Sequence, residues 1–214
     1  IWIKNLPRTK LGLPILVRGG RVWSMKIKEV KTAFKIADVV LNKTHSKNRI
    51  KFKYVKKLLD EHEEAISENA LRKRVGFVYI IAINKIIKKI GGSQGKGGIK
   101  STMNFYEGAM QGGPSIRSYG IHLLLQKELE AGKKVEFYVI VSKEVKTEIK
   151  GMFGNVKGTI VAFKEMEEKC NEDYKSVTGK YPDWHFQSRG KGAGYRWPKW
   201  IRQSYAKYRI DNKV

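Results

Sequence analysis

The chain has 214 residues, of which 41% are hydrophobic and 30% are charged, so it can bury a real core and falls outside the disordered class. Its formal net charge of +24 indicates a polyanionic partner, and nucleic acid fits better than an anionic membrane because no basic amphipathic helix with a broad apolar face stands out. The single cysteine, Cys170, excludes a disulfide framework or cysteine-rich zinc site and fits a reducing, cytoplasmic setting; we find no signal peptide and no run of the roughly 20 apolar residues that would span a membrane.

Residues 1–74 are predicted to form a basic, largely helical region that binds DNA. Residues 1–25 are interrupted by prolines and a glycine pair, so we expect an irregular arm along a phosphate backbone, with a solvated extension as the alternative. Apolar residues recur at helical spacing in 26–45 and again in 50–66. The second segment begins with lysines, which oppose a helix dipole and therefore indicate an external anion. Two helices around a polar break suit a module that reads a DNA groove, although helix pairs are also common structural elements.

Residues 75–187 are predicted to form a compact unit of the α+β (α/β) class. The run at 76–84 is apolar without strict alternation, which predicts a strand buried on both faces. We expect a small antiparallel three-stranded sheet flanked by helices. The predicted strands lie at 76–84, 86–90 and 133–141, and the predicted helices follow the glycine-rich loop at 91–98, begin at Ser115, and span 163–177.

Basic residues in a loop and in the C-terminal tail are the predicted nucleic-acid contacts. The loop at 91–98 can aim backbone N–H groups at phosphate, but it lacks the Gly-Lys-Ser/Thr ending of a P-loop. The tail, 188–214, interleaves cations with aromatic residues that can stack on bases or pack on the core. The alternative is a packed C-terminal helix, held by Trp200 and Tyr208, with solvated charges. The predicted contacts are Lys96, Arg189, Lys191, Arg196 and Arg202.

Short motifs in the central unit resemble those of the GIY-YIG nuclease superfamily. Gly76-Phe-Val-Tyr79 stands where the first motif is expected, and Lys89-Ile-Gly91 stands where the second is expected. The resemblance is closest to small phage DNA endonucleases and type II restriction enzymes of this family, and it covers residues 75–187. It continues in family order through Met103-Asn-Phe-Tyr106, Arg117 to His122, Val135-Glu-Phe-Tyr138 and Tyr181-Pro-Asp-Trp-His-Phe-Gln187.

The resemblance implies that the chain hydrolyses DNA phosphodiester bonds with one divalent metal ion, Mg²⁺ or Mn²⁺. Such chemistry needs an oxygen ligand for a hard cation, and positive groups that neutralise charge on the phosphate. Two residues expected from the family are missing. Lys89 stands in place of the second-motif tyrosine, and the position expected for the helix arginine falls near Thr102. The implied catalytic residues are Tyr79, Arg117, His122 and Glu167, with Lys89 and Lys100 as cations that can compensate for the missing groups.

Some of these assignments compete with structural alternatives. Tyr79 could be an ordinary core tyrosine, and His122 lies five residues after Arg117, a poor fit to one helix face. Glu167 is the predicted metal ligand because it lies on the apolar stripe of its helix, with Phe163 and Tyr174, where a carboxylate has no structural reason to be. The competing carboxylates share a face without apolar residues: Glu165, Glu168 and Glu172.

The favoured function is a sequence-specific DNA endonuclease of the restriction type. Its substrate would be double-stranded DNA, and a homodimer would match two symmetric half-sites. The central position of the nuclease unit favours a restriction enzyme over a homing endonuclease. The missing arginine and the high charge favour the alternative of a non-enzymatic nucleic-acid-binding protein, including a ribonucleoprotein component. A third alternative is an unrelated α/β unit with a coincidental motif order.

Overall fold

A five-stranded antiparallel sheet organises the computed structural model, which describes residues 24–55, 71–142, 144–188 and 194–213. The strand order is β2-β1-β5-β3-β4. The strands are β1 (Phe34–Leu41), β2 (Ile50–Tyr54), β3 (Phe77–Ile83), β4 (Ile86–Ser93) and β5 (Val135–Val141). The helices are η1 (Ile27–Glu29), α1 (Gly98–Glu107), α2 (Ile116–Glu130), α3 (Phe163–Thr178) and α4 (Lys199–Asn212). Two further hairpins are β6 (Glu144–Gly151) with β7 (Gly154–Val161), and β8 (Gln187–Ser188) with β9 (Gly194–Tyr195).

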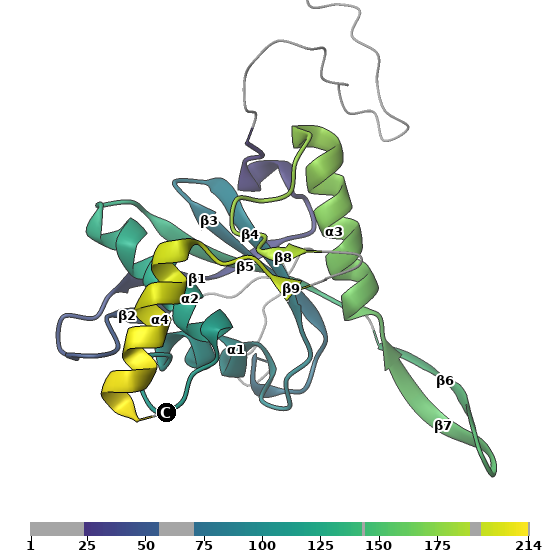
Figure 1. Ribbon diagram of the computed structural model, residues 1–214. Helices are drawn as coiled ribbons and strands as arrows, with labels where there is room; N and C mark the ends of the chain where they lie inside the picture. Colours follow the sequence, from purple (N-terminus) through teal and green to yellow (C-terminus); the bar gives the residue numbers. More distant parts are fainter. Residues whose placement is uncertain (1–23, 56–70, 143, 189–193, 214) are drawn as a thin grey trace, which may run out of the picture.

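Helices cover both faces of the sheet (Figure 1). Every residue of β3 is buried, as the apolar run predicts. Tyr79 and its alternate neighbours pack with α1, α2 and α4, whereas Val78 and Ile80 pack on the opposite face with α3 and η1. Among the described residues we find no helix with the length and apolar character needed to cross a membrane.

The sheet is larger than the sequence predicted. β3, β4 and β5 form the expected three strands, but β1 and β2 extend the sheet beyond β5. The helices predicted for 26–45 and 50–66 are therefore wrong: apart from the short 3-10 helix η1, the described parts of these segments form β1, β2 and their connections, and no helix-turn-helix is formed by 34–54. In β2 the buried Ile50 and Phe52 alternate with exposed lysines, which is the period-two pattern of a strand. The rest of the second predicted helix, 56–66, and the predicted arm at 1–23 lie outside the described residues.

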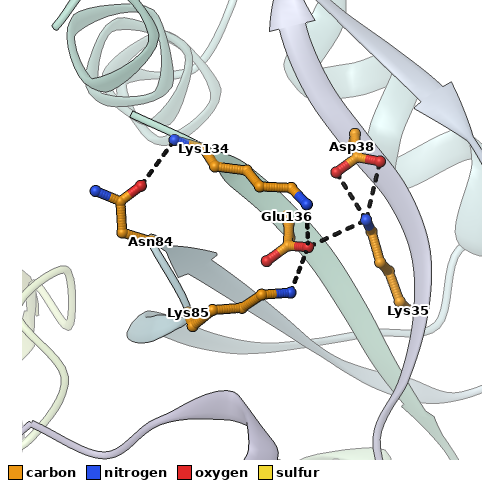
Figure 2. Close-up of polar contacts among 6 residues, drawn as sticks. All are labelled: Lys35, Asp38, Asn84, Lys85, Lys134 and Glu136. Carbon is orange, nitrogen blue, oxygen red and sulfur yellow. Dashed lines mark hydrogen bonds and ion pairs between the residues drawn. The ribbon is translucent and has the colours of Figure 1, made fainter. Parts of the chain in front are cut away.

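The buried carboxylate of Glu136 contacts three lysines: one on β1, one in the turn between β3 and β4, and one just before β5 (Figure 2). Glu136 of β5 has a fully buried side chain, and its Oε1 lies 3.1, 2.8 and 3.3 Å from the Nζ atoms of Lys35, Lys85 and Lys134. Oδ1 of Asp38 also lies 2.7 Å from Nζ of Lys35, so this lysine forms ion pairs with both carboxylates. Burial alone would raise the pKa of Glu136, but hydrogen bonds from the three lysines outweigh burial and lower the pKa.

Replacing Glu136 with glutamine removes the charge that binds the three lysines and should therefore lower the free energy of unfolding at pH 7. The expected loss is only about 1–3 kcal/mol because water partly screens the lysines. A pKa lowered by folding stabilises the protein above the unfolded value of 4.5, and this contribution is lost as the pH falls below it. Urea unfolding at pH 7 and pH 3 measures the difference. Glu130→Gln on the exposed end of α2 is the control, and a Glu136→Gln deficit that persists undiminished at pH 3 would contradict the assignment.

Candidate active site

Two glycines of β4 let side chains from β3 and α3 lie directly against the sheet. Tyr79 pairs with Gly91 across the β3–β4 ladder, and a Cβ atom at Gly91 would lie 2.4 Å from the Tyr79 hydroxyl oxygen. A Cβ atom at Gly92 would lie 2.6 Å from Oε2 of Glu167. The second sequence motif thus has a physical reason for its glycine: the tyrosine of the first motif occupies the space that any other side chain would fill.

Tyr79 is held in a hydrogen-bonded group with Tyr106 and Arg117. The two tyrosine hydroxyl oxygens are 2.6 Å apart, and Nη2 of Arg117 donates to the Tyr79 oxygen at 3.2 Å. Nζ of Lys89 lies 5.9 Å from the centre of the Tyr79 ring. Both tyrosine side chains are fully buried, so each hydroxyl depends on the protein for its partners.

The surroundings push the pKa values of the two tyrosines apart. Burial alone would raise the pKa of Tyr79, but the charges of Lys89 and Arg117 and the hydrogen bonds from Tyr106 and Arg117 lower it below 10.0. Burial and the neighbouring Tyr79 raise the pKa of Tyr106 well above its ordinary value. When Tyr79 loses its proton, Tyr106 keeps its own and donates it to the Tyr79 oxygen.

Arg117 and Glu167 line connected hollows on one side of the molecule. Arg117 lines three hollows: one with Tyr79 and Tyr106, and two with Glu167 and His185. Lys89 lines one of the hollows that Arg117 and Glu167 share. Arg117 therefore lies between the hollow that contains the tyrosine pair and the two hollows that contain the carboxylate.

His122 and Lys100 lie away from these hollows. The His122 side chain is fully buried, and its Nδ1 lies 2.8 Å from the backbone oxygen of Tyr106. Burial lowers the pKa of His122, so the ring is neutral, donates from Nδ1 and helps to position Tyr106. Nζ of Lys100 lies 4.9 Å from the centre of the Tyr54 ring. Neither residue lines the hollows described above, so contact with a substrate is not supported for either one.

Thr102 occupies the position where the family resemblance leads us to expect an arginine. Its hydroxyl oxygen lies 3.0 Å from that of Ser93, and both residues line the hollow that contains Tyr79 and Arg117. The hollow therefore has a hydroxyl pair at this point, and Arg117 is the charged side chain among its lining residues.

The structure describes three of the five predicted nucleic-acid contacts. Lys96 is exposed in the turn before α1, and Arg196 and Arg202 are exposed at and near α4. Arg189 and Lys191 lie outside the described residues. The tail is also packed: Trp197 before α4 and Ile201 on it are buried, and Tyr208 packs on Tyr119 with ring centroids 5.0 Å apart, whereas Trp200 is 40% exposed.

His185 is a site residue that the sequence prediction did not include. It lines both hollows that contain Glu167, and its ring stacks on Tyr181 with centroids 4.5 Å apart. The available signal was the segment at 181–187, where this histidine replaces the asparagine of the family pattern. Tyr106 was also left out, although it follows Met103 at the helical spacing of a buried face.

No protein-family model and no curated protein matches the sequence. Among solved structures, a mutant of EndoII from bacteriophage T4 is similar with a TM-score of 0.48 and 20% identity, covering 75% of this chain and 98% of that chain. The restriction endonuclease HPY188I, in complex with product DNA, is similar with a TM-score of 0.43 and 18% identity, covering 77% of this chain and 88% of that chain. At TM-scores below 0.5 we draw no conclusion about the site from either likeness.

The donor chemistry around Glu167 fits a hard divalent cation. The carboxylate lines an open hollow, and the missing Cβ of Gly92 leaves space beside Oε2. The described residues contain no group of three or more histidine, cysteine or acidic side chains that could hold a metal ion on their own. Glu167 would therefore act as one protein ligand beside water and phosphate oxygens, an arrangement that suits Mg²⁺.

Adding a methyl group at Gly92 is expected to displace the Glu167 carboxylate. The nearest atom to the new Cβ is the far end of a flexible side chain, but the Phe163 ring and the Glu167 Cβ would lie 3.1 and 3.2 Å away. Gly92→Ala should therefore lower thermal stability modestly while lowering any metal-dependent activity of the site about 100-fold. Gly95→Ala is the matched control, because its nearest neighbour is a backbone oxygen 3.9 Å away. Equal activity of the two variants would show that the position of Glu167 is unimportant.

Proposed function

We propose that this chain is a DNA endonuclease that hydrolyses phosphodiester bonds with a bound divalent metal ion, Mg²⁺ or Mn²⁺. The observation that carries the proposal is the position of Arg117, which lines one hollow with Tyr79 and two others with Glu167. The order of the GIY-YIG-like motifs in the sequence supports it independently. The excess of 44 basic over 20 acidic residues suits a polyanionic substrate.

Tyr79 acts as the general base in this proposal. Its lowered pKa and the hydrogen bond donated by Tyr106 prepare its oxygen to accept a proton. Because Tyr79 is fully buried before substrate binds, Arg117 must turn from the tyrosine oxygen toward the incoming phosphate and so open a path for water. The water oxygen then bonds to phosphorus, its proton passes to the ionised Tyr79 oxygen, the bond from phosphorus to the leaving oxygen breaks, and the leaving oxygen takes up a proton from solvent.

The remaining groups stabilise the charge of the reacting phosphate. Arg117 and Lys89 neutralise the charge that grows on the phosphate oxygens, in a site walled by aromatic residues. A metal ion held by Glu167 would supply Lewis-acid stabilisation of the same phosphate and of the leaving oxygen. His185 lines both hollows that contain Arg117 and Glu167 and can contact the same substrate.

Double-stranded DNA is the proposed substrate, and the restriction type is the proposed class. Exposed cations at Lys96, Arg196 and Arg202 would bind the backbone on either side of the scissile phosphate. Two copies of the chain would cut the two strands of a symmetric site.

A non-enzymatic nucleic-acid-binding protein is the second candidate. The observation that favours it is Thr102, a neutral residue bonded to Ser93 where the family resemblance leads us to expect a cation. Under this alternative the basic surface would bind a nucleic acid and the concave surface would carry no chemistry.

A cleavage assay separates the two candidates. The protein is incubated in excess over mixed-sequence duplex DNA with Mg²⁺, with EDTA as the control and with binding measured in parallel in Ca²⁺. The endonuclease proposal predicts discrete fragments in Mg²⁺ only. Binding without cleavage, in Mg²⁺ and in Mn²⁺, would decide for the second candidate.

A further inference from the structure

The β6–β7 hairpin projects away from the rest of the molecule (Figure 1). Its two strands pair with each other from Glu144 with Val161 to Gly151 with Gly154. No other described helix or strand packs extensively on either of them. An isolated two-stranded hairpin is marginally stable in water, so this arm lacks the support that a larger sheet would give it.

The two faces of the arm differ in character. Side chains that point to one face alternate along each strand, and the cross-strand pairs keep like with like. One face carries the pairs Val145 with Ile160, Thr147 with Gly158, and Ile149 with Val156. The other face carries the pairs Lys146 with Thr159, Glu148 with Lys157, and Lys150 with Asn155.

The apolar face is exposed. Val145, Val156 and Ile160 are 58%, 59% and 50% exposed, and Ile149 lies across Gly158, whose missing side chain leaves room for it. Met152 and Phe153, at the tip, are 93% and 100% exposed. Contiguous apolar surface of this kind marks an interaction site rather than ordinary protein surface.

Charge identifies the partner. A contact with a nucleic acid needs cations on the contacting face, but Lys146, Lys150 and Lys157 all lie on the opposite face. The apolar face carries no charge at all in a chain whose formal charge is +24. A second copy of this chain presents an identical uncharged face, and two such faces can pack around a two-fold axis.

The length of the arm removes the main obstacle to this contact, which is repulsion between two strongly basic bodies. Eight-residue strands reach about 27 Å at about 3.4 Å per residue. Surface charges in physiological salt are screened over about 8 Å. Contact through the arms therefore joins two chains while their basic bodies remain separated by more than the screening length.

We propose that the β6–β7 hairpin is a dimerisation arm, whose apolar face packs against the same face of a second copy of the chain. The contact is smaller than a standard interface, so we expect a dimer that dissociates at micromolar concentrations, with a Kd of roughly 10⁻⁶ to 10⁻⁴ M. The dimer gives the proposed endonuclease its second active site, but the contact itself needs neither DNA nor metal.

Sedimentation velocity on the full chain, without DNA or metal, tests the arm. The dimer fraction should rise with protein concentration, and it should rise again with added salt because salt screens the repulsion between the bodies. Val145→Lys combined with Val156→Lys should weaken the dimer at least ~100-fold by placing charges in the apolar contact. Thr159→Lys combined with Asn155→Lys adds the same charge to the opposite face and should leave dimerisation within about threefold of the wild type.

A second measurement locates the contact directly. Val156→Cys should form a covalent dimer with a short bismaleimide, whereas the wild type should not, because burial raises the pKa of its only thiol, Cys170, to about 11. Thermal melting of each variant confirms that the core is intact. A wild type that stays monomeric at every concentration and salt would overturn the proposal, as would equal effects of the two lysine pairs. Loss of DNA affinity in Val145→Lys/Val156→Lys without any change in mass would reassign the arm to nucleic acid.

Discussion

Replacing Glu167 with glutamine is expected to lower Mg²⁺-dependent DNA cleavage by ~1,000-fold or more, while DNA binding changes little. Glutamine keeps the size of the side chain but removes the charge that would hold the metal ion. Glu167 lines two hollows that also contain Arg117, so a metal ion at this carboxylate would lie near the cation that is proposed to bind the phosphate. Single-turnover cleavage, with protein in excess over a duplex substrate, measures the loss without interference from product release.

Glu165→Gln is the matched control for this change. Glu165 lies on the same helix, two residues earlier, and is exposed. We expect it to cleave DNA within about twofold of the wild type, as is usual for a surface substitution. Equal losses in both variants would show that only the overall negative charge of α3 matters, and not a carboxylate at position 167. A fully active Glu167→Gln protein would show that Glu167 does not take part in catalysis.

Replacing Tyr79 with phenylalanine is the second large effect that we expect. Loss of a general base typically lowers the rate by roughly 100- to 10,000-fold. A base must be deprotonated to act, so the wild-type rate should rise with pH and then level off above the pKa of Tyr79. The neighbouring charges of Lys89 and Arg117 lower this pKa below 10.0 against the opposing effect of burial, so levelling should occur at a lower pH than for a free tyrosine.

Tyr106→Phe should shift the pH–rate profile in one direction, whereas a general structural defect would lower the rate without such a shift. The hydrogen bond from Tyr106 helps to lower the pKa of Tyr79, so removing it should move the profile to higher pH. Tyr138→Phe, on the other face of the sheet, should leave the profile where it is. A profile that moves to lower pH in Tyr106→Phe, or one that is flat in the wild type, would contradict the role of Tyr79 as the base.

The strands of the central unit could be predicted because burial on both faces leaves a plain signal. β3 is an unbroken apolar run, and β5 pairs with it along its whole length.

β1 gave a misleading signal. The pairing of β1 with β5 shifts between Lys35 and Ala37, so Ile36 and Ala37 are both buried although they are consecutive. Such a bulge breaks the alternation of a strand and leaves apolar spacings that imitate a helix.

The site was predictable where a motif fixed a residue on a strand or on the packed side of a helix. Tyr79 and Glu167 were predicted this way, because one lies in the first motif and the other on an apolar stripe, and each lines a hollow that also contains Arg117. Their catalytic roles stay predictions. His122 illustrates the limit of motif reading: five residues turn a helix by about 140° beyond one full turn, which carries His122 from the Arg117 side into the core. The partnership of Tyr106 with Tyr79 spans 27 positions in the chain and no local pattern announces it.

The most direct test of one shared site is a complementation assay between Tyr79→Phe and Glu167→Gln. Each inactive variant is assayed alone and the two are then mixed in equal amounts, with a mixture of wild type and Glu167→Gln to calibrate how much activity an intact site restores. If tyrosine, arginine and carboxylate of one chain act on the same phosphate, no chain in the first mixture has a complete site, and cleavage should stay at the level of the separate variants. Recovery toward the calibrated level would contradict this, because it would place the tyrosine and the carboxylate in separate centres or on different subunits.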